Sequence, residues 1–195
     1  MKQLLYFTSL LTASLGFSQD LFFSEYAEGS SNNKYLEIYN PTNTHIDLSA
    51  YAYPNANGGS DGTYEYWNDF DEGAVIPAGG VYVIAHPSAN QSIKDEADEL
   101  HSYLSNGDDG YALVKGTESA YTIIDVIGDF GADPGSGWDV AGVSNATKDR
   151  TLVRKSTVYS GNRYWDSSRG TTTENSEWVV NCLLYTSDAA DDLVG

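Results

Sequence analysis

A serine between glycines is the first candidate for chemistry in this chain. Gly58, Ser60 and Gly62 have the spacing of a nucleophile elbow, in which a strained, exposed serine attacks an acyl carbon. Such an elbow needs a buried strand before the serine and a helix after it. Here a polar loop precedes Ser60 and an aromatic segment follows it, so we interpret the segment as a glycine-rich loop. We therefore assign no catalytic residue.

Histidines and acids are the candidates for metal binding. Each histidine lacks a second histidine or a cysteine at zinc-ligand spacing, so we expect surface or capping roles for His45, His86 and His101. Acids also gather in three loops, where oxygen ligands suit calcium: Asp69, Asp71 and Glu72; Asp108 and Asp109; Asp129, Asp133 and Asp139. None has the spacing of a calcium loop, so we interpret them as solvated and assign no metal or cofactor, and calcium binding by these loops stays open as the alternative. A pair of acids for glycoside hydrolysis stays open, because such a pair need not be close in sequence.

Aromatic side chains raise a third chemistry, the stacking of sugars. The chain has 15 tyrosines and 4 tryptophans. The candidates for a stacking platform are Tyr64, Tyr66, Trp67, Trp138 and Trp165. A carbohydrate-binding domain predicts an exposed row of these rings, whereas a packed sandwich buries most of its large aromatics. Three of them lie in the irregular loop from Pro54 to Gly73, which is the best candidate for a binding surface because long loops in compact domains are often functional.

The charge of the chain limits its partners. There are 28 acidic and 10 basic residues, giving a formal net charge of −18. Such a surface repels phosphate backbones, so we expect no direct binding to nucleic acid. The bases that crowd the C-terminal third are interpreted as members of surface ion pairs: Arg150, Arg154, Lys155, Arg163 and Arg169.

The two ends of the chain are set apart from the fold. Residues 1–18 combine Lys2, an apolar run too short to span a bilayer, and small residues at Gly16 and Ser18. They predict a signal peptide cleaved before Gln19, and hence a secreted or cell-surface protein without a transmembrane segment after cleavage. Residues 182–195 resemble a translated sequencing adapter, so we interpret them as a non-native read-through tail that replaces the native continuation past Asn181. Residues 19–181 then form one domain without a disulfide.

Alternating apolar residues predict the elements of this domain. In Lys34–Tyr39, Leu36 and Ile38 point to one side of a strand that ends at Asn40-Pro41. The pattern recurs in residues 44–51 and predicts a strand beside the first. Further strands are expected at 21–26, 74–76, 81–85, 111–115, 120–128, 149–154 and 177–180, with 81–85 central in its sheet. One helix is expected within residues 92–104. Together these elements indicate an all-β sandwich or small barrel with one short helix in a connection.

Several motifs in this order resemble the lamin tail domain in its secreted bacterial form. They are Phe23-Ser24-Glu25-Tyr26, Leu36-Glu37-Ile38-Tyr39-Asn40-Pro41, Ile76-Pro77-Ala78-Gly79-Gly80, Asn106-Gly107-Asp108-Asp109-Gly110, Ile124-Asp125-Val126-Ile127-Gly128 and Thr151-Leu152-Val153-Arg154-Lys155. The resemblance spans residues 21–180 and implies an immunoglobulin-like β-sandwich that is not an enzyme. It supplies structural positions only, and the loop from Asn55 to Gly73 departs from it.

Three functions follow as hypotheses. The first is a non-catalytic, secreted binding or adhesion module that mediates protein, surface or substrate attachment, as a fragment of a larger protein. The second is an N-terminal accessory domain of an extracellular hydrolase, such as a nuclease, whose catalytic domain would lie beyond Asn181. The third is a free-standing carbohydrate-binding domain. The expected partner is a protein, a cell surface or a polysaccharide.

Overall fold

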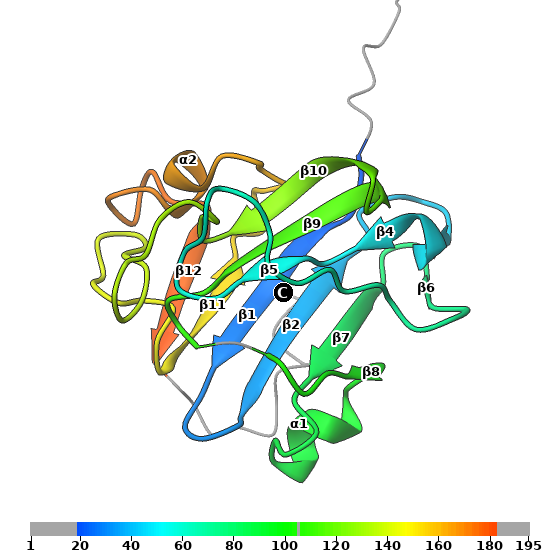
Figure 1. Cartoon of the computed structure of the whole chain (residues 1–195), viewed down its shortest axis with the longest axis horizontal. Helices are drawn as coiled ribbons and strands as arrows, with labels where there is room; N and C mark the ends of the chain where they lie inside the picture. The colour runs from blue at the N-terminus through cyan, green and yellow to red at the C-terminus, as the bar shows by residue number, and fades with distance from the viewer. Residues whose placement is uncertain (1–18, 105, 183–195) are drawn as a thin grey trace, which may run out of the picture.

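A computed structural model describes residues 19–104 and 106–182. The expected signal peptide, residues 1–18, and residues 183–195 of the expected tail lie outside the described residues. Cys182, which we assigned to that tail, is the last residue of a strand and pairs with Arg150. The described chain forms two layers of strands, one behind the other in Figure 1.

The larger layer is a six-stranded sheet. Its strands follow the order β12 (Trp178–Cys182), β11 (Arg150–Arg154), β1 (Phe22–Glu28), β2 (Lys34–Tyr39), β7 (Val81–Ala85) and β8 (Glu99–Leu100). All neighbours are antiparallel except β7 and β8, which run parallel.

The smaller layer is a four-stranded sheet. It consists of β10 (Ala120–Ile127), β9 (Gly110–Thr117) and β4 (Tyr51–Ala52), with β5 (Asn55–Ala56) also paired to β9. A separate two-stranded pair joins β3 (Ile46–Asp47) to β6 (Val75–Ile76). The helical segments are η1 (Leu48–Ala50), α1 (Gln91–Asp95) and α2 (Trp165–Arg169).

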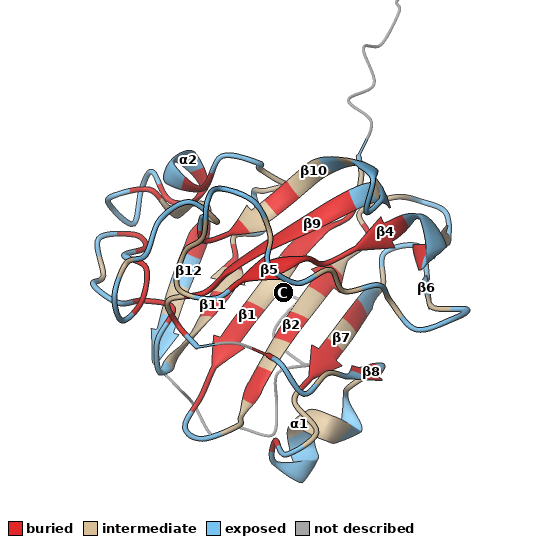
Figure 2. Ribbon diagram, viewed as in Figure 1, coloured by how far each residue is buried: buried red, intermediate tan, exposed pale blue. Residues whose placement is uncertain are grey.

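The core lies between the two sheets, where the buried stripes of the central strands face each other (Figure 2). Strand β2 shows why: Leu36 and Ile38 are buried, while Tyr35, Glu37 and Tyr39 are only half-buried on the other face. The four-stranded sheet contributes Tyr111, Leu113 and Ile127 to the same core. This arrangement confirms the all-β, immunoglobulin-like sandwich expected from the sequence.

The segment 44–51 was predicted wrongly as a strand beside β2. The neighbours of β2 are β1 and β7, and β3 pairs with β6 instead. The physical cause is Asp47, whose side chain accepts a hydrogen bond from the Ser49 N–H at 2.8 Å and caps the turn of η1. The chain therefore leaves the two-stranded pair after two strand residues and enters the four-stranded sheet at Tyr51.

Two further expectations need correction near β7. The expected helix in residues 92–104 is only the five-residue α1, because Glu99 and Leu100 extend alongside β7 as β8. Since β8 is only two residues long, β7 lies close to the sheet edge and exposes Val81, rather than being central. A second short helix, α2, was not anticipated.

A buried ion pair joins the two layers. Asp125 of β10 accepts hydrogen bonds from Arg154 Nη2 of β11, from the Phe23 N–H of β1 at 2.8 Å, and from the Asn162 N–H at 2.8 Å. Burial raises the pKa of the Asp125 carboxyl, while Arg154 and the backbone donors oppose that rise by stabilising the ionised form. Arg154 is therefore a core residue, contrary to the expected surface ion pair.

The surroundings of Arg154 extend this connection to two more elements. Its Nη1 donates to Ser168 Oγ of α2 at 3.0 Å and to Glu177 Oε2 at 2.7 Å, and the guanidinium lies 4.0 Å from the ring centroid of Trp178 in β12. Register shifts in β1 between Phe23 and Glu25 and in β10 between Ile123 and Asp125 occur beside it. These bulges aim the Phe23 N–H and the Asp125 carboxylate at the same point between the layers.

Removing Asp125 should therefore be far more damaging than removing an exposed acid. We expect Asp125→Ala to lower the free energy of unfolding by about 3–5 kcal/mol, because the Arg154 charge then loses its buried carboxylate and keeps only the partly exposed Glu177. The measurement is urea denaturation followed by tryptophan fluorescence. The control is Asp166→Ala, which removes the exposed Arg169–Asp166 pair and should cost about 1 kcal/mol or less. Equal losses in the two variants would contradict this account.

Candidate functional site

Ser60 does not have the surroundings of a nucleophile. Its hydroxyl donates to two backbone carbonyls, that of Thr63 and that of Phe130 at 3.0 Å. Its own N–H also donates to the Phe130 carbonyl, at 2.6 Å. Both side-chain contacts use the serine proton to close a loop, whereas an activated serine passes that proton to a base. The structure supports the interpretation of this segment as a glycine-rich loop.

The three histidines have different surroundings. His86 Nδ1 accepts the Ser88 N–H at 3.0 Å within a turn, and His45 is exposed. His101 packs edge-on against Tyr53, with ring centroids 5.6 Å apart, and burial lowers the pKa of its imidazole. Across residues 19–104 and 106–182, no three side chains of His, Cys, Asp or Glu gather in a way that could hold a metal ion.

The acidic loops use their carboxylates to hold backbone. Asp109 is buried and accepts the N–H groups of Gly58 at 2.9 Å and Asn106 at 2.7 Å. Asp129 and Asp133 each accept the N–H two residues later in the chain, at 2.7 Å. This is the common Asx-turn geometry, which organises a loop without a bound ion.

The predicted aromatic platform is divided between two places. Trp138 and Trp165 are buried in the core and pack edge to face, with ring centroids 6.2 Å apart. Tyr64, Trp67 and Tyr121 form a separate cluster, with centroids 5.3–5.9 Å apart. The single row of five rings that a carbohydrate-binding domain predicted is therefore not formed.

The loop from Pro54 to Gly73 folds back over the outer face of the four-stranded sheet. Backbone bonds tie it to the sheet, from Tyr53 N to Asn68 O at 2.9 Å and from Asn55 N to Tyr66 O at 3.0 Å. Beneath it, Ala52, Ala112 and Val114 form a small apolar cluster that packs against Trp67, Tyr121 and Phe130. The loop is thus an ordered cover with a core of its own.

The rings that remain accessible define an aromatic loop surface, made of Tyr64, Tyr66, Trp67 and Tyr121. Tyr66 is the most open, with 54% of its surface exposed. Carboxylates hold Tyr64 and Trp67 in place: Tyr64 Oη donates to Glu118 at 3.2 Å, and Trp67 Nε1 donates to Asp69 at 2.7 Å. The surface therefore combines aromatic faces with hydrogen-bond acceptors.

Glu99 of β8 anchors the far end of this loop. Its carboxylate is buried and accepts hydrogen bonds from the Tyr53 hydroxyl, from the Tyr82 hydroxyl at 3.0 Å, and from the Asp71 N–H at 3.2 Å. One side chain at the edge of the six-stranded sheet thus fixes both the chain after β4 and the end of the loop.

A second electrostatic feature lies on the outer face of the six-stranded sheet. Glu25 and Glu37 are direct cross-strand partners on β1 and β2, in one row with Val153 and Val83. Burial, and then repulsion by Glu37, raise the pKa of Glu25 to about 7, and the Tyr35 hydroxyl donates to it at 2.7 Å. Burial also raises the pKa of Glu37, which accepts from Ser24 Oγ at 2.6 Å. Sequence reasoning missed this pair because alternation shows the face of each glutamate, whereas only the register sets them opposite each other.

The chain is similar to one known family of protein domains. A family model described as Lamin Tail Domain matches residues 17–129, more than half of the chain. A comparison with curated proteins finds no match. Among the helices of the described residues, none has the length and apolar character that crossing a membrane requires.

The Glu25–Glu37 pair should make stability depend on pH. A carboxyl whose pKa rises from 4.5 to about 7 on folding holds an extra proton between these values. Its contribution is therefore fully present below pH 4.5 and is lost as the pH rises through about 7. We expect Glu25→Gln to be more stable than the original protein at pH 8, by about 1–2 kcal/mol, and equally stable at pH 4.5.

Thermal unfolding across this pH range measures the effect. Glu72→Gln, a change at an exposed loop residue, is the matched control and should leave the pH dependence unaltered. A Glu25→Gln variant with the same pH dependence as the original protein would contradict the assigned role of the pair.

Proposed function

The chain belongs to the lamin tail domain family, a family of non-catalytic immunoglobulin-like domains, and we propose that it is a secreted binding module that attaches to an extracellular surface. The proposal divides the molecule into a rigid sandwich and a binding loop. The sandwich supplies a fixed frame, because the Asp125–Arg154 pair and the core connect its layers. The loop from Pro54 to Gly73 supplies the contact.

The aromatic loop surface is the observation that carries this proposal. This loop exposes the Tyr66 ring to solvent, and it packs the rings of Tyr64 and Trp67 against each other, with centroids 5.4 Å apart. Carboxylates hold the rings of Tyr64 and Trp67, and the backbone of Tyr66 is hydrogen-bonded to Asn55, before any ligand binds, so little entropy is lost on contact. Such pre-organised aromatic side chains are typical of binding surfaces.

Polysaccharide is the ligand class that suits this surface best. Aromatic rings pack against the apolar faces of sugars, and carboxylates accept hydrogen bonds from sugar hydroxyls. Asp61, Glu65 and Asp69 supply exposed carboxylates on the same loop. The formal net charge of −18 disfavours polyanionic ligands, so neutral or cationic polysaccharides are the better partners.

Secretion is the second part of the proposal. It is supported by the basic start, the short apolar run and the small residues of the first 18 positions. Aromatic surfaces that bind cell-wall or matrix polysaccharides also function outside the cell, which is consistent with export.

Co-sedimentation with insoluble cellulose, chitin and peptidoglycan tests the binding function. We expect retention on at least one of them, and a loss of affinity of about tenfold in Tyr66→Ala, because removing one stacked ring costs roughly 1–1.5 kcal/mol. Tyr103→Ala removes an exposed tyrosine elsewhere and is the matched control. Absence of retention on all three polymers, or release of soluble sugars during incubation, would contradict the proposal.

Export has its own test. Expressed in a bacterial host with its first 18 residues intact, the protein should appear outside the cytoplasm with Gln19 as its first residue. Terminal sequencing of the purified protein by mass spectrometry measures this. A cytoplasmic protein that retains Met1 would argue against secretion.

A further inference from the structure

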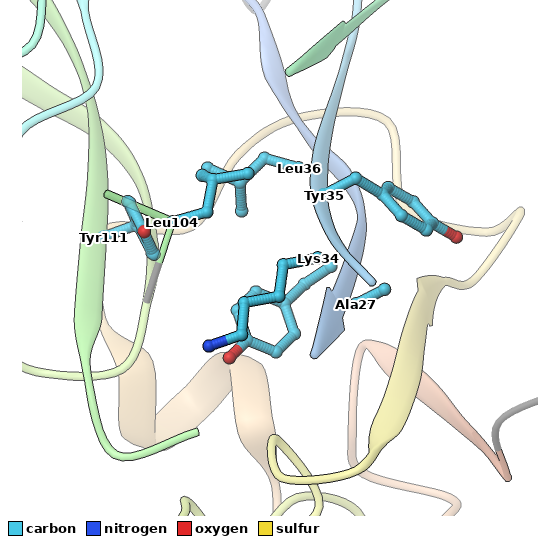
Figure 3. A pocket seen from close by; sticks show the side chains of 7 residues that line it. Ala27, Lys34, Tyr35, Leu36, Leu104 and Tyr111 are labelled. Atoms are coloured by element: carbon cyan, nitrogen blue, oxygen red, sulfur yellow. The ribbon is translucent and has the colours of Figure 1, made fainter. Parts of the chain in front are cut away.

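A buried lysine lies against an asparagine side chain between the two sheets. Lys34, the first residue of β2, is only 8% exposed, and its Nζ donates to Asn106 Oδ1 at 2.9 Å. Figure 3 shows the Lys34 side chain on the same side of β2 as Leu36, opposite Tyr35, in a depression that Leu104 and Tyr111 also line. The amine is therefore held among apolar and aromatic groups, next to the carbon of a side-chain amide.

Asn106 is held in place from its other side. Its N–H donates to the buried Asp109 carboxylate at 2.7 Å. The next residue, Gly107, is buried, and its carbonyl accepts from Thr147 Oγ1 at 2.6 Å. A Cβ at Gly107 would lie only 2.8 Å from Lys148 Cα, so neighbouring backbone encloses this glycine tightly.

That confinement matters for the chemistry of Asn106. In a flexible Asn-Gly sequence the backbone nitrogen of the glycine attacks the side-chain amide and forms a cyclic imide. Here Gly107 is fixed, which hinders attack by its nitrogen, and Lys34 Nζ is the nitrogen in hydrogen-bond contact with the side-chain amide.

A carboxyl group lies opposite Lys34 on the neighbouring strand β1, on the same face of the sheet. Glu28 is the direct cross-strand partner of Lys34 and is itself buried. Burial raises the pKa of Glu28, although the Asp149 N–H donates to it at 3.0 Å and favours its ionised form. Such a group can take up a proton and return it, as general acid–base catalysis requires.

We propose that Lys34 and Asn106 become joined by an intramolecular isopeptide bond, with Glu28 as the proton carrier. The ammonium of Lys34 passes a proton to Glu28, and the neutral amine adds to Cγ of Asn106. Glu28 returns that proton to the amide nitrogen of Asn106, the bond between Cγ and this nitrogen breaks, and the second proton of the adding amine passes to the departing ammonia, which leaves as ammonium. The products are one amide bond and one ammonium ion, so atoms and charge balance without any oxidant or cofactor.

The position of the bond gives it a structural purpose. Lys34 begins β2 of the six-stranded sheet, and Asn106 precedes β9 of the four-stranded sheet. A bond between them joins the two layers and closes a chain segment of 72 residues. Asn106 is solvent-exposed, which lets the ammonia depart. The domain contains no disulfide among its described residues, so this bond would be its covalent cross-link.

Mass spectrometry of the purified protein tests the proposal. The protein is expressed with additional residues before Gln19, because an N-terminal glutamine also loses ammonia when it cyclises. We expect an intact mass lower by one ammonia than the sequence mass, and a branched peptide after trypsin digestion that contains both Lys34 and Asn106. Lys34→Arg and Asn106→Ala should have their full sequence masses, and the control Lys115→Arg should still lose one ammonia.

Two further measurements separate the bond from the hydrogen bond seen between these side chains. Glu28→Gln, confirmed as folded by circular dichroism, should have its full sequence mass. Lys34→Arg should unfold at a temperature lower by roughly 10 °C, because the long closed segment is released. An unmodified mass for the original protein, or ammonia loss confined to a linear peptide containing Asn106 and Gly107, would overturn the proposal. A fully linked, folded Glu28→Gln would overturn the role of Glu28.

Discussion

The contact between Asp125 and Arg154 is the constraint on which the sandwich depends. A carboxylate and a guanidinium are costly to bury, and their cost is offset only because every direction around them is occupied by a partner. Phe23 of β1, Asn162, Ser168 of α2, Glu177 and Trp178 of β12 supply those partners. Because Asp125 belongs to the four-stranded sheet and Arg154 to the six-stranded sheet, the pair fixes how the two sheets lie against each other. The bulges in β1 and β10 are the local adjustments that bring these groups together.

The two outer faces of this sandwich have different characters. The four-stranded sheet carries a folded loop with its own apolar cluster, and that loop presents tyrosine and tryptophan rings among carboxylates. The six-stranded sheet presents a row in which Glu25 and Glu37 lie between valines. One frame thus holds an aromatic surface on one side and a pair of carboxyls that titrate together on the other.

The long strands could be read from the sequence because each has a buried stripe with a period of two residues. Leu36 and Ile38 identify β2 in this way, and the expected residues of β9, β10, β11 and β12 agree closely with those observed. Among the two-residue strands, β6 falls within the expected segment 74–76, whereas β5 and β8 were not predicted, since a period needs more residues than they contain. The helix expected within residues 92–104 ends at Asp95, because Glu99 gains three hydrogen bonds in an extended chain, and helical periodicity contains no information about those distant donors.

The candidate site was also predicted only in part from the sequence. The sequence indicated the loop from Pro54 to Gly73 as a binding region. It did not show that Trp138 and Trp165 are buried in the core and therefore are not among the exposed rings. The role of Arg154 was also misjudged, because its type suits a surface and only its neighbours across the sandwich make burial favourable. Residues whose function depends on partners far away in the chain were the ones that pattern alone could not place.

Glu99 connects the aromatic loop to the edge of the larger sheet, and this connection would carry mechanical load if the proposed ligand were anchored. Its carboxylate connects the end of the aromatic loop, through Asp71, to β8, which is a parallel strand of two residues at the sheet edge. Tension applied to the loop by an anchored ligand would pass along this connection and reach the weakest margin of the larger sheet first. That margin is joined to β7 through two residue pairs, whereas the interior around Asp125 is held by partners from several elements.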